Sequence, residues 1–131
     1  MPSLHLFRNA PEVIAVAAGD YIFRIGEPAK VMYLVIEGEI ELMLGDTVVE
    51  TAKQGAFIGE MALIDDEPRS ASARALGECR VFPIDEVRFQ SLVQETPFFA
   101  LQVMKALAHR LRKMDALVKA VPKARKAKKQ G

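Results

Sequence analysis

Residues 32–48 read MYLVIEGEIELMLGDTV and contain two short apolar runs separated by a glycine. The first run, Met32 to Ile36, is apolar almost throughout, as expected of a strand that is buried on both faces. The second run starts at Ile40 with alternating apolar and charged residues and ends in Gly45-Asp46, a pair that favours a hairpin turn. This stretch therefore predicts consecutive antiparallel strands.

Glycine turns recur on both sides of this stretch, from Val13 to about Arg80. Short apolar runs between closely spaced turns are typical of a sandwich or barrel. The residue pattern changes from strand to helix after Phe82, and Asp85 can cap a helix that runs to about Glu95.

Thr96-Pro97 is a strong start signal for a second helix, with threonine as N-cap and proline at the first helical position. We therefore expect a mainly β fold with flanking helices: a double-stranded β-helix, or jelly-roll-like β-roll, over about residues 11–82, followed by two helices over about 85–121. Together they form one domain, residues 1–121. The remaining residues, 122–131, are expected to be a flexible basic tail.

The second helix carries a narrow apolar stripe at alternating steps of four and three. Such a stripe fits a two-helix homodimer seam over residues 97–121, or packing against the β-roll of the same chain, and we favour the dimer because the stripe is narrow and long. Its members are Ala100, Met104, Leu107, Leu111, Met114, Val118 and Val121.

The bulk composition is that of an ordinary globular protein, with half of the residues hydrophobic and a net charge of only +1. The single cysteine, Cys79, excludes an intramolecular disulfide, and no Cys/His spacing indicates a metal site. The longest apolar run, Val13 to Ala18, is far shorter than the roughly 20 residues of a membrane-spanning helix. We expect a cytoplasmic protein with no membrane span.

Residues 57–71, FIGEMALIDDEPRSA, have a pattern that suits the binding of a small anion. A strand ends at Gly59, a short helical turn follows, and Arg69 arrives after an acidic bend and a proline. A helix that begins after a glycine leaves backbone N–H groups free for an anion. Arg69 can bind phosphate with a forked pair of hydrogen bonds, and Glu60 can accept a hydrogen bond from a sugar hydroxyl.

This segment resembles the phosphate-binding cassette of the cyclic nucleotide-binding domain family, whose pattern is Gly-Glu-x-Ala-Leu, a spacer, and Pro-Arg followed by small residues. Gly59-Glu60-Met61-Ala62-Leu63 and Pro68-Arg69-Ser70-Ala71 match it without a gap. The resemblance covers nearly all of residues 10–118 and is strongest to the Crp/Fnr-like bacterial sensors.

The resemblance implies a role for each matched residue. Glu60 would bind the ribose 2′-hydroxyl, Arg69 would bind the exocyclic phosphate oxygens, and Ser70 would touch the phosphate or the base. Arg110 or Met114, on the second helix, would lie near the base as part of a lid. The expected ligand-binding residues are Gly59, Glu60, Met61, Ala62, Arg69, Ser70 and Ala71.

The resemblance therefore implies a receptor for cyclic AMP, or less favourably cyclic GMP, that signals to a downstream protein through movement of its lid helix. We expect neither catalysis, nor a cofactor or metal, nor sequence-specific DNA binding, because no helix-turn-helix follows the second helix. The alternative is a scaffold or nucleic-acid-associated accessory protein that keeps the fold without nucleotide binding.

Overall fold

The computed structural model describes residues 7–119, and side chains as far as residue 113. Within this part of the chain, eight strands form two four-stranded antiparallel sheets. In order across the first sheet, the strands are β1 (Ile14–Val16), β8 (Cys79–Ile84), β3 (Met32–Glu37) and β6 (Phe57–Ile58). In order across the second sheet, they are β2 (Tyr21–Phe23), β7 (Ser72–Ala75), β4 (Ile40–Leu44) and β5 (Thr47–Ala52).

The segment 32–48 folds as its sequence predicts. Leu34, Val35 and Ile36 of β3 are all fully buried, because β3 lies inside the first sheet and is covered on both faces. β4 and β5 form a hairpin in which Leu44 pairs with Thr47. Gly45 takes a φ of 60°, which lies in the left-handed region that a tight hairpin turn requires.

Two apolar clusters make the core. One lies between the sheets and includes Val35, Ile58 and Val81. The other lies between the first sheet and the helices, where Phe82 and Phe99 are among the largest fully buried side chains. Burial of apolar side chains on this scale is the main favourable term in the folding of the domain.

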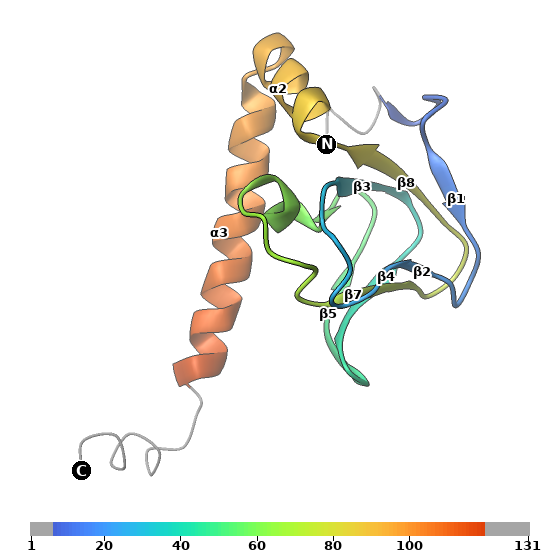
Figure 1. Ribbon diagram of the computed structural model, residues 1–131, viewed down its shortest axis with the longest axis vertical. Coiled ribbons are helices and arrows are strands. Elements are labelled where there is room, and N and C mark those ends of the chain that lie inside the picture. The colour runs from blue at the N-terminus through green and yellow to red at the C-terminus, as the bar shows by residue number, and fades with distance from the viewer. Residues whose placement is uncertain (1–6, 120–131) are drawn as a thin grey trace.

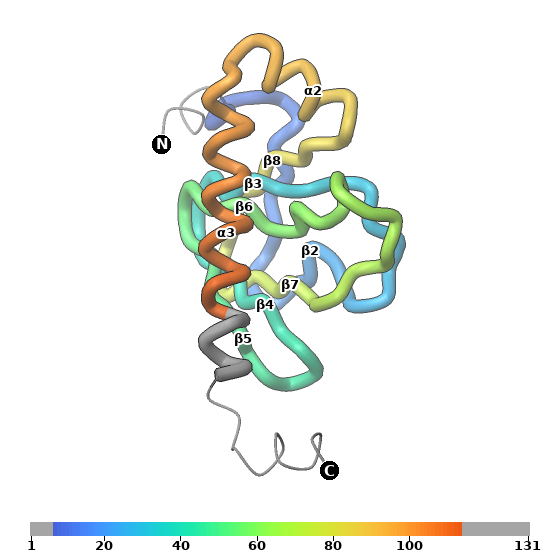
Figure 2. The backbone as a smooth tube through the Cα atoms, turned by 90° about the vertical axis from the view of Figure 1, so that its left-hand side faces the viewer, coloured from blue at the N-terminus to red at the C-terminus, as the bar shows by residue number. Residues whose placement is uncertain are grey.

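Two helices close the β-roll. α2 (Glu86–Glu95) begins as predicted, because the carboxylate of Asp85 accepts a hydrogen bond from the Arg88 N–H at 2.8 Å. α3 (Phe98–Lys119) runs along one side of the roll, and a 3₁₀ turn, η1 (Glu60–Leu63), lies between them (Figure 1). In a view turned by 90°, α3 crosses in front of the strands (Figure 2). The expected β-roll followed by two helices is confirmed.

The apolar stripe predicted on α3 is divided between two environments. The face that packs against the roll centres on Phe99 and Val103, which are 2% and 5% exposed, and Leu107 joins them at the edge of the core. Met104 and Leu111 point into solvent with 57% and 66% exposure. The stripe is therefore not one continuous seam, because the roll buries a different face of the helix.

Three members of the stripe lie beyond the last described side chain. The side chains of Met114 and Val118, and the whole of Val121 and the tail 122–131, lie outside the described residues. No helix in the described part of the chain has the length and apolar character needed to cross a membrane.

Candidate functional site

The site begins at the junction between β6 and η1. Gly59 has a φ of 70°, and a Cβ atom on it would lie 2.6 Å from Nη1 of Arg69. Both facts require glycine, because other residues rarely adopt this conformation and because the arginine needs the space. The turn thus places Glu60 and Arg69 on either side of a residue without a side chain.

Glu60 is a buried carboxylate at the first position of η1, with only 2% of its surface exposed. Its Oε1 pairs with Nη1 of Arg110 from α3. Its Oε2 is buried and has no hydrogen-bond partner among the described residues. A buried carboxylate oxygen without a partner costs about 1 to 3 kcal/mol or more, so it marks a place where a donor is missing.

Arg69 is held rigidly by its own backbone. Its N–H donates to the carbonyl of Glu27 and its carbonyl accepts from the N–H of Gly26, both at 2.9 Å. These two bonds tie the loop after β2 to the arginine, so the position of the guanidinium depends on a turn that is more than forty residues away in sequence.

The Arg69 guanidinium is buried over an aromatic ring. Nη2 donates to the Val31 carbonyl at 2.7 Å, Nη1 donates to the Gly59 carbonyl at 3.4 Å, and the group lies 4.1 Å above the centre of the Phe23 ring. Burial lowers the pKa of Arg69, while charges on neighbouring groups that include Glu27 oppose this shift. Its Nε is also buried, and no partner for it exists within the described chain.

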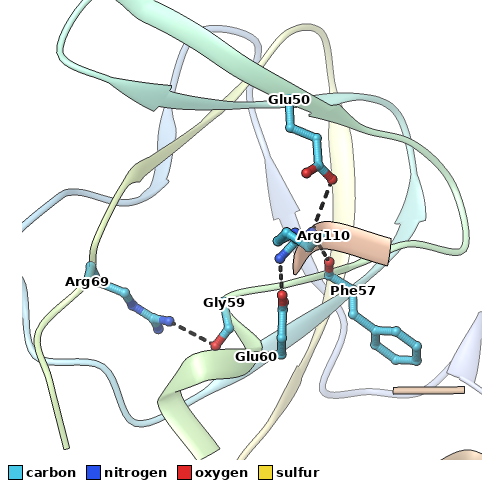
Figure 3. Close-up of polar contacts among 6 residues, drawn as sticks. All are labelled: Glu50, Phe57, Gly59, Glu60, Arg69 and Arg110. Atoms are coloured by element: carbon cyan, nitrogen blue, oxygen red, sulfur yellow. Dashed lines mark hydrogen bonds and ion pairs between the residues drawn. The ribbon is translucent and has the colours of Figure 1, made fainter. Parts of the chain in front are cut away.

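Arg110 joins α3 to this site. Besides Glu60, it donates from Nη2 to Oε2 of Glu50 at 3.1 Å and to the Phe57 carbonyl at 3.2 Å (Figure 3). The side chains of Glu50 and Arg110 are only 19% and 26% exposed, so this is a partly buried network and not a surface pair. One guanidinium therefore serves two carboxylates on different elements.

The arrangement places groups that are complementary to a sugar phosphate on one side of the roll. A fixed cation with a free N–H lies on one side of Gly59, and a carboxylate with a free oxygen lies on the other. Arginine is suited to forked recognition of a phosphate, and a carboxylate can only accept from a hydroxyl. A donor of Arg69 and an acceptor of Glu60 thus lie on either side of Gly59 without partners among the described residues.

The other residues predicted for the site surround this pair less closely. Met61 and Ser70 are exposed, and Ala62 and Ala71 are half-buried. The N–H of Ala62 donates to the Gly59 carbonyl at 3.1 Å within η1, so a phosphate would share this donor with that carbonyl. Arg110 contacts Glu60, whereas the side chain of Met114 is outside the described residues.

The acidic bend between η1 and Pro68 is locally stabilised, because Oδ1 of Asp65 accepts from the Glu67 N–H at 3.1 Å. Across residues 7–119, no cluster of three or more His, Cys, Asp or Glu side chains could hold a metal ion. Cys79 is buried in the core, and its thiol donates to the carbonyls of Glu39 and Gly77.

Sequence reasoning did not identify three groups that shape the site: Glu50, Phe23 and the Val31 carbonyl. A carbonyl contributes no signal to the sequence, and Phe23 has the pattern of an ordinary core residue. Glu50 lies between Val49 and Thr51, which are both exposed, and has the pattern of a solvated residue. Glu50 gains a role only because Arg110 reaches it from the closing helix.

The sequence profile of the cyclic nucleotide-binding domain matches residues 13–96, which include both unpaired groups. The chain belongs to this family. Two relatives in the family illustrate the similarity. A cAMP-dependent protein kinase regulatory subunit of Emericella nidulans is 37% identical over 87 residues, which are 65% of this chain and 21% of that protein. A cyclic nucleotide-gated potassium channel of Mesorhizobium japonicum is 40% identical over 85 residues, 65% of this chain and 23% of the channel.

A solved structure shows the same fold. The catabolite activator protein of Thermus thermophilus superposes with a TM-score of 0.75 at 26% identity, over 91% of this chain and 59% of that protein. The cyclic nucleotide-binding domain is thus one part of each of these larger proteins, and this chain spans less than a quarter of the length of the two curated relatives.

Proposed function

We propose that this chain is a non-catalytic receptor that binds a cyclic nucleotide between the β-roll and α3. In this proposal Arg69 binds the exocyclic phosphate oxygens and Glu60 binds the ribose 2′-hydroxyl. The observation that carries the proposal is a pair of buried atoms without partners among residues 7–119, Oε2 of Glu60 and Nε of Arg69. One is an acceptor and the other a donor, and a cyclic nucleotide supplies the complement of each.

The energetic argument favours a ligand at this place. Each buried polar atom without a partner costs about 1 to 3 kcal/mol, and a charged one costs more. A phosphate oxygen would accept from Arg69 Nε, and a ribose hydroxyl would donate to Glu60 Oε2. Ligand binding would therefore satisfy both atoms without breaking the Arg69 bonds to Val31 and Gly59 that hold the guanidinium in place.

We favour cyclic AMP over cyclic GMP as the ligand. The cassette resembles that of bacterial receptors, and one relative is named as a cAMP-dependent regulatory subunit. Cyclic GMP is the second choice. Ser70 directly follows Arg69, and its exposed hydroxyl could form a hydrogen bond with guanine.

In the proposed mechanism, α3 is a lid whose position depends on the ligand. Arg110 is the group that connects them, because it binds Glu60 and the ribose would bind the same carboxylate. A ligand shifts the equilibrium between two lid positions only by its difference in affinity for them. Changed contacts around Arg110 would supply that difference and expose a new surface to a downstream protein.

We further propose that the protein works as a homodimer in the cytoplasm, with α3 against α3 of a second copy. The exposed side of α3 carries Leu101, Met104 and Leu111, which are 40%, 57% and 66% exposed. These residues recur on the face of the helix that the roll leaves uncovered, and two copies of this face would bury each other. The cytoplasmic location agrees with a single, unpaired cysteine.

Ligand-dependent melting tests the receptor against the scaffold alternative. Cyclic AMP and cyclic GMP are compared with linear 5′-AMP, which has the same base and sugar as cyclic AMP but no cyclic phosphate. A ligand present at a hundred times its Kd adds about 2.7 kcal/mol of stability. This predicts a rise in Tm of about 5 °C or more with a cyclic nucleotide and a much smaller one with 5′-AMP. An unchanged Tm with every nucleotide would favour the scaffold.

A further inference from the structure

A cavity of about 170 Å³ lies beside Arg110, between α3 and the segment that joins β5 to β6. Its charged or titratable lining side chains are Glu50, His109 and Arg110, and Ala56, Phe57 and Ala106 contribute apolar surface. This space is separate from the Arg69 guanidinium, which does not line it. It is large enough for several water molecules or for part of a planar ring.

The polar groups that lead to this cavity follow a fixed order. Arg69 and Glu60 flank Gly59, Glu60 binds Arg110, and Arg110 binds Glu50 at 3.1 Å (Figure 3). In a nucleotide, the carbon that bears the 2′-hydroxyl is bonded to the carbon that bears the base. If Glu60 holds the 2′-hydroxyl, the base leaves the sugar close to Arg110, with Glu50 as the next polar group.

Glu50 and Arg110 present opposite hydrogen-bonding characters to a base. A carboxylate only accepts and a guanidinium only donates, so the pair selects a base edge that has a donor beside an acceptor. Adenine shows this combination at its N6 amino group and N7, whereas guanine shows two acceptors, O6 and N7, at the same edge. At its Watson–Crick edge adenine again has its N6 donor beside an acceptor. Guanine presents a donor beside an acceptor at only one of these two edges.

We propose that Glu50 is a specificity-determining residue that accepts a hydrogen bond from the 6-amino group of adenine. This inference rests on the proposed function, because it needs the ribose at Glu60. It extends that function by naming the residue that selects the base. Glu50 keeps Arg110 as its partner through Oε2, and its second oxygen serves the ligand.

Titration calorimetry with two cyclic nucleotides tests this role. The ligands are cyclic AMP and cyclic inosine monophosphate, which carries an oxygen where adenine has its 6-amino group. We expect the native protein to bind cyclic AMP about tenfold or more tightly than cyclic inosine monophosphate. In Glu50→Gln, the amide can donate to that oxygen as well as accept from an amino group, so the ratio is expected to fall to within about threefold.

Glu41→Gln is the matched control. Glu41 lies on the neighbouring strand β4, and its side chain is 17% exposed, close to the 19% of Glu50. It pairs with Arg74 at 3.0 Å, and neither residue lines the cavity. This variant removes one carboxylate and one ion pair of the same kind, and the native ratio of affinities is expected to persist.

An unchanged ratio in Glu50→Gln would overturn the inference, including the case in which both ligands weaken by the same factor. In that case Glu50 would act only by holding Arg110, and the proposed receptor function would stand. Failure of the native protein to bind any cyclic nucleotide would overturn the proposed function and the inference together. The native titration therefore distinguishes the two failures.

Discussion

Arg110 and Glu60 lie fifty positions apart in the sequence, and their side chains form the ion pair that joins α3 to η1. Glu60 is almost fully buried and Arg110 is partly buried, so the pair is shielded from solvent on the side of the roll. The second oxygen of the same carboxylate has no partner in the described part of the chain. In the proposed function, Glu60 therefore binds the ligand and α3 at the same time.

Breaking this pair is expected to destabilise the ligand-free protein. Arg110→Met keeps much of the side-chain volume but leaves Glu60 as a buried charge, and because Arg110 is a quarter exposed we expect a cost of about 1 to 3 kcal/mol. In a Glu60→Gln background, the same change is expected to cost at least about 0.5 kcal/mol less. Urea denaturation of the four proteins measures this coupling. Strictly additive costs would show that the two side chains do not act as a pair.

Gly59→Ala is expected to reduce nucleotide binding by displacing Arg69. The added Cβ would lie 2.6 Å from Nη1 of the arginine, at a backbone φ of 70° that alanine tolerates poorly. Gly45→Ala is the control, because Gly45 has a φ of 60° in the turn between β4 and β5 and a Cβ there meets nothing within 4 Å. We expect both variants to lose about 1 kcal/mol of stability, and Gly59→Ala alone to lose about tenfold or more in affinity for cyclic AMP. Equal affinities would show that the contact with Arg69 is unimportant.

A change in the ligand tests the role of Glu60 without altering the fold. Cyclic AMP that lacks the 2′-hydroxyl is expected to bind the native protein more weakly by about 1 to 3 kcal/mol, because Oε2 of Glu60 loses its donor. Glu60→Ala is expected to weaken cyclic AMP by a similar amount and then to bind the deoxy ligand equally well. Calorimetric titration gives both comparisons. Normal binding of the deoxy ligand to the native protein would exclude Glu60 as the ribose ligand.

Leu111→Glu is expected to convert the proposed dimer to a monomer. Leu111 is on the uncovered face of α3, where a pair of carboxylates facing each other across a seam would repel. Val87→Glu introduces the same charge at a valine on α2 that is 74% exposed, and it is expected to leave the mass unchanged. Sedimentation equilibrium measures the mass of each protein. A native monomer would exclude the proposed dimer, and a dimer that survives Leu111→Glu would place the interface elsewhere.

The strands and the cassette could be predicted from the sequence because their signals are local. The glycine at 45, the buried run in β3 and the cap at Asp85 each act on residues close in sequence, and the structure confirms all three elements. The Gly-Glu and Pro-Arg segments of the cassette are nine positions apart, so their spacing is also visible in the sequence.

The contacts made by α3 were predicted less well because they depend on how the helix is rotated. The helix has apolar residues on two faces, and periodicity could not decide that Val103 packs on the roll while Met104 faces solvent. Glu50 gave no signal, because an acidic residue in an edge strand has the pattern of a solvated one until Arg110 reaches it. Such pairings depend on tertiary packing and are not encoded by residues near one another in sequence.

The most direct test of the central claim is calorimetric titration of cyclic AMP into the native protein, Arg69→Ala and Arg74→Ala. Arg74 lies on β7 and pairs with Glu41, so its removal controls for the loss of one arginine. We predict micromolar or tighter binding to the native protein and to Arg74→Ala, and a loss of about 2 to 5 kcal/mol in Arg69→Ala, which is roughly 30-fold or more in affinity. No binding to the native protein, or unchanged affinity in Arg69→Ala, would contradict the account of a phosphate site at Arg69.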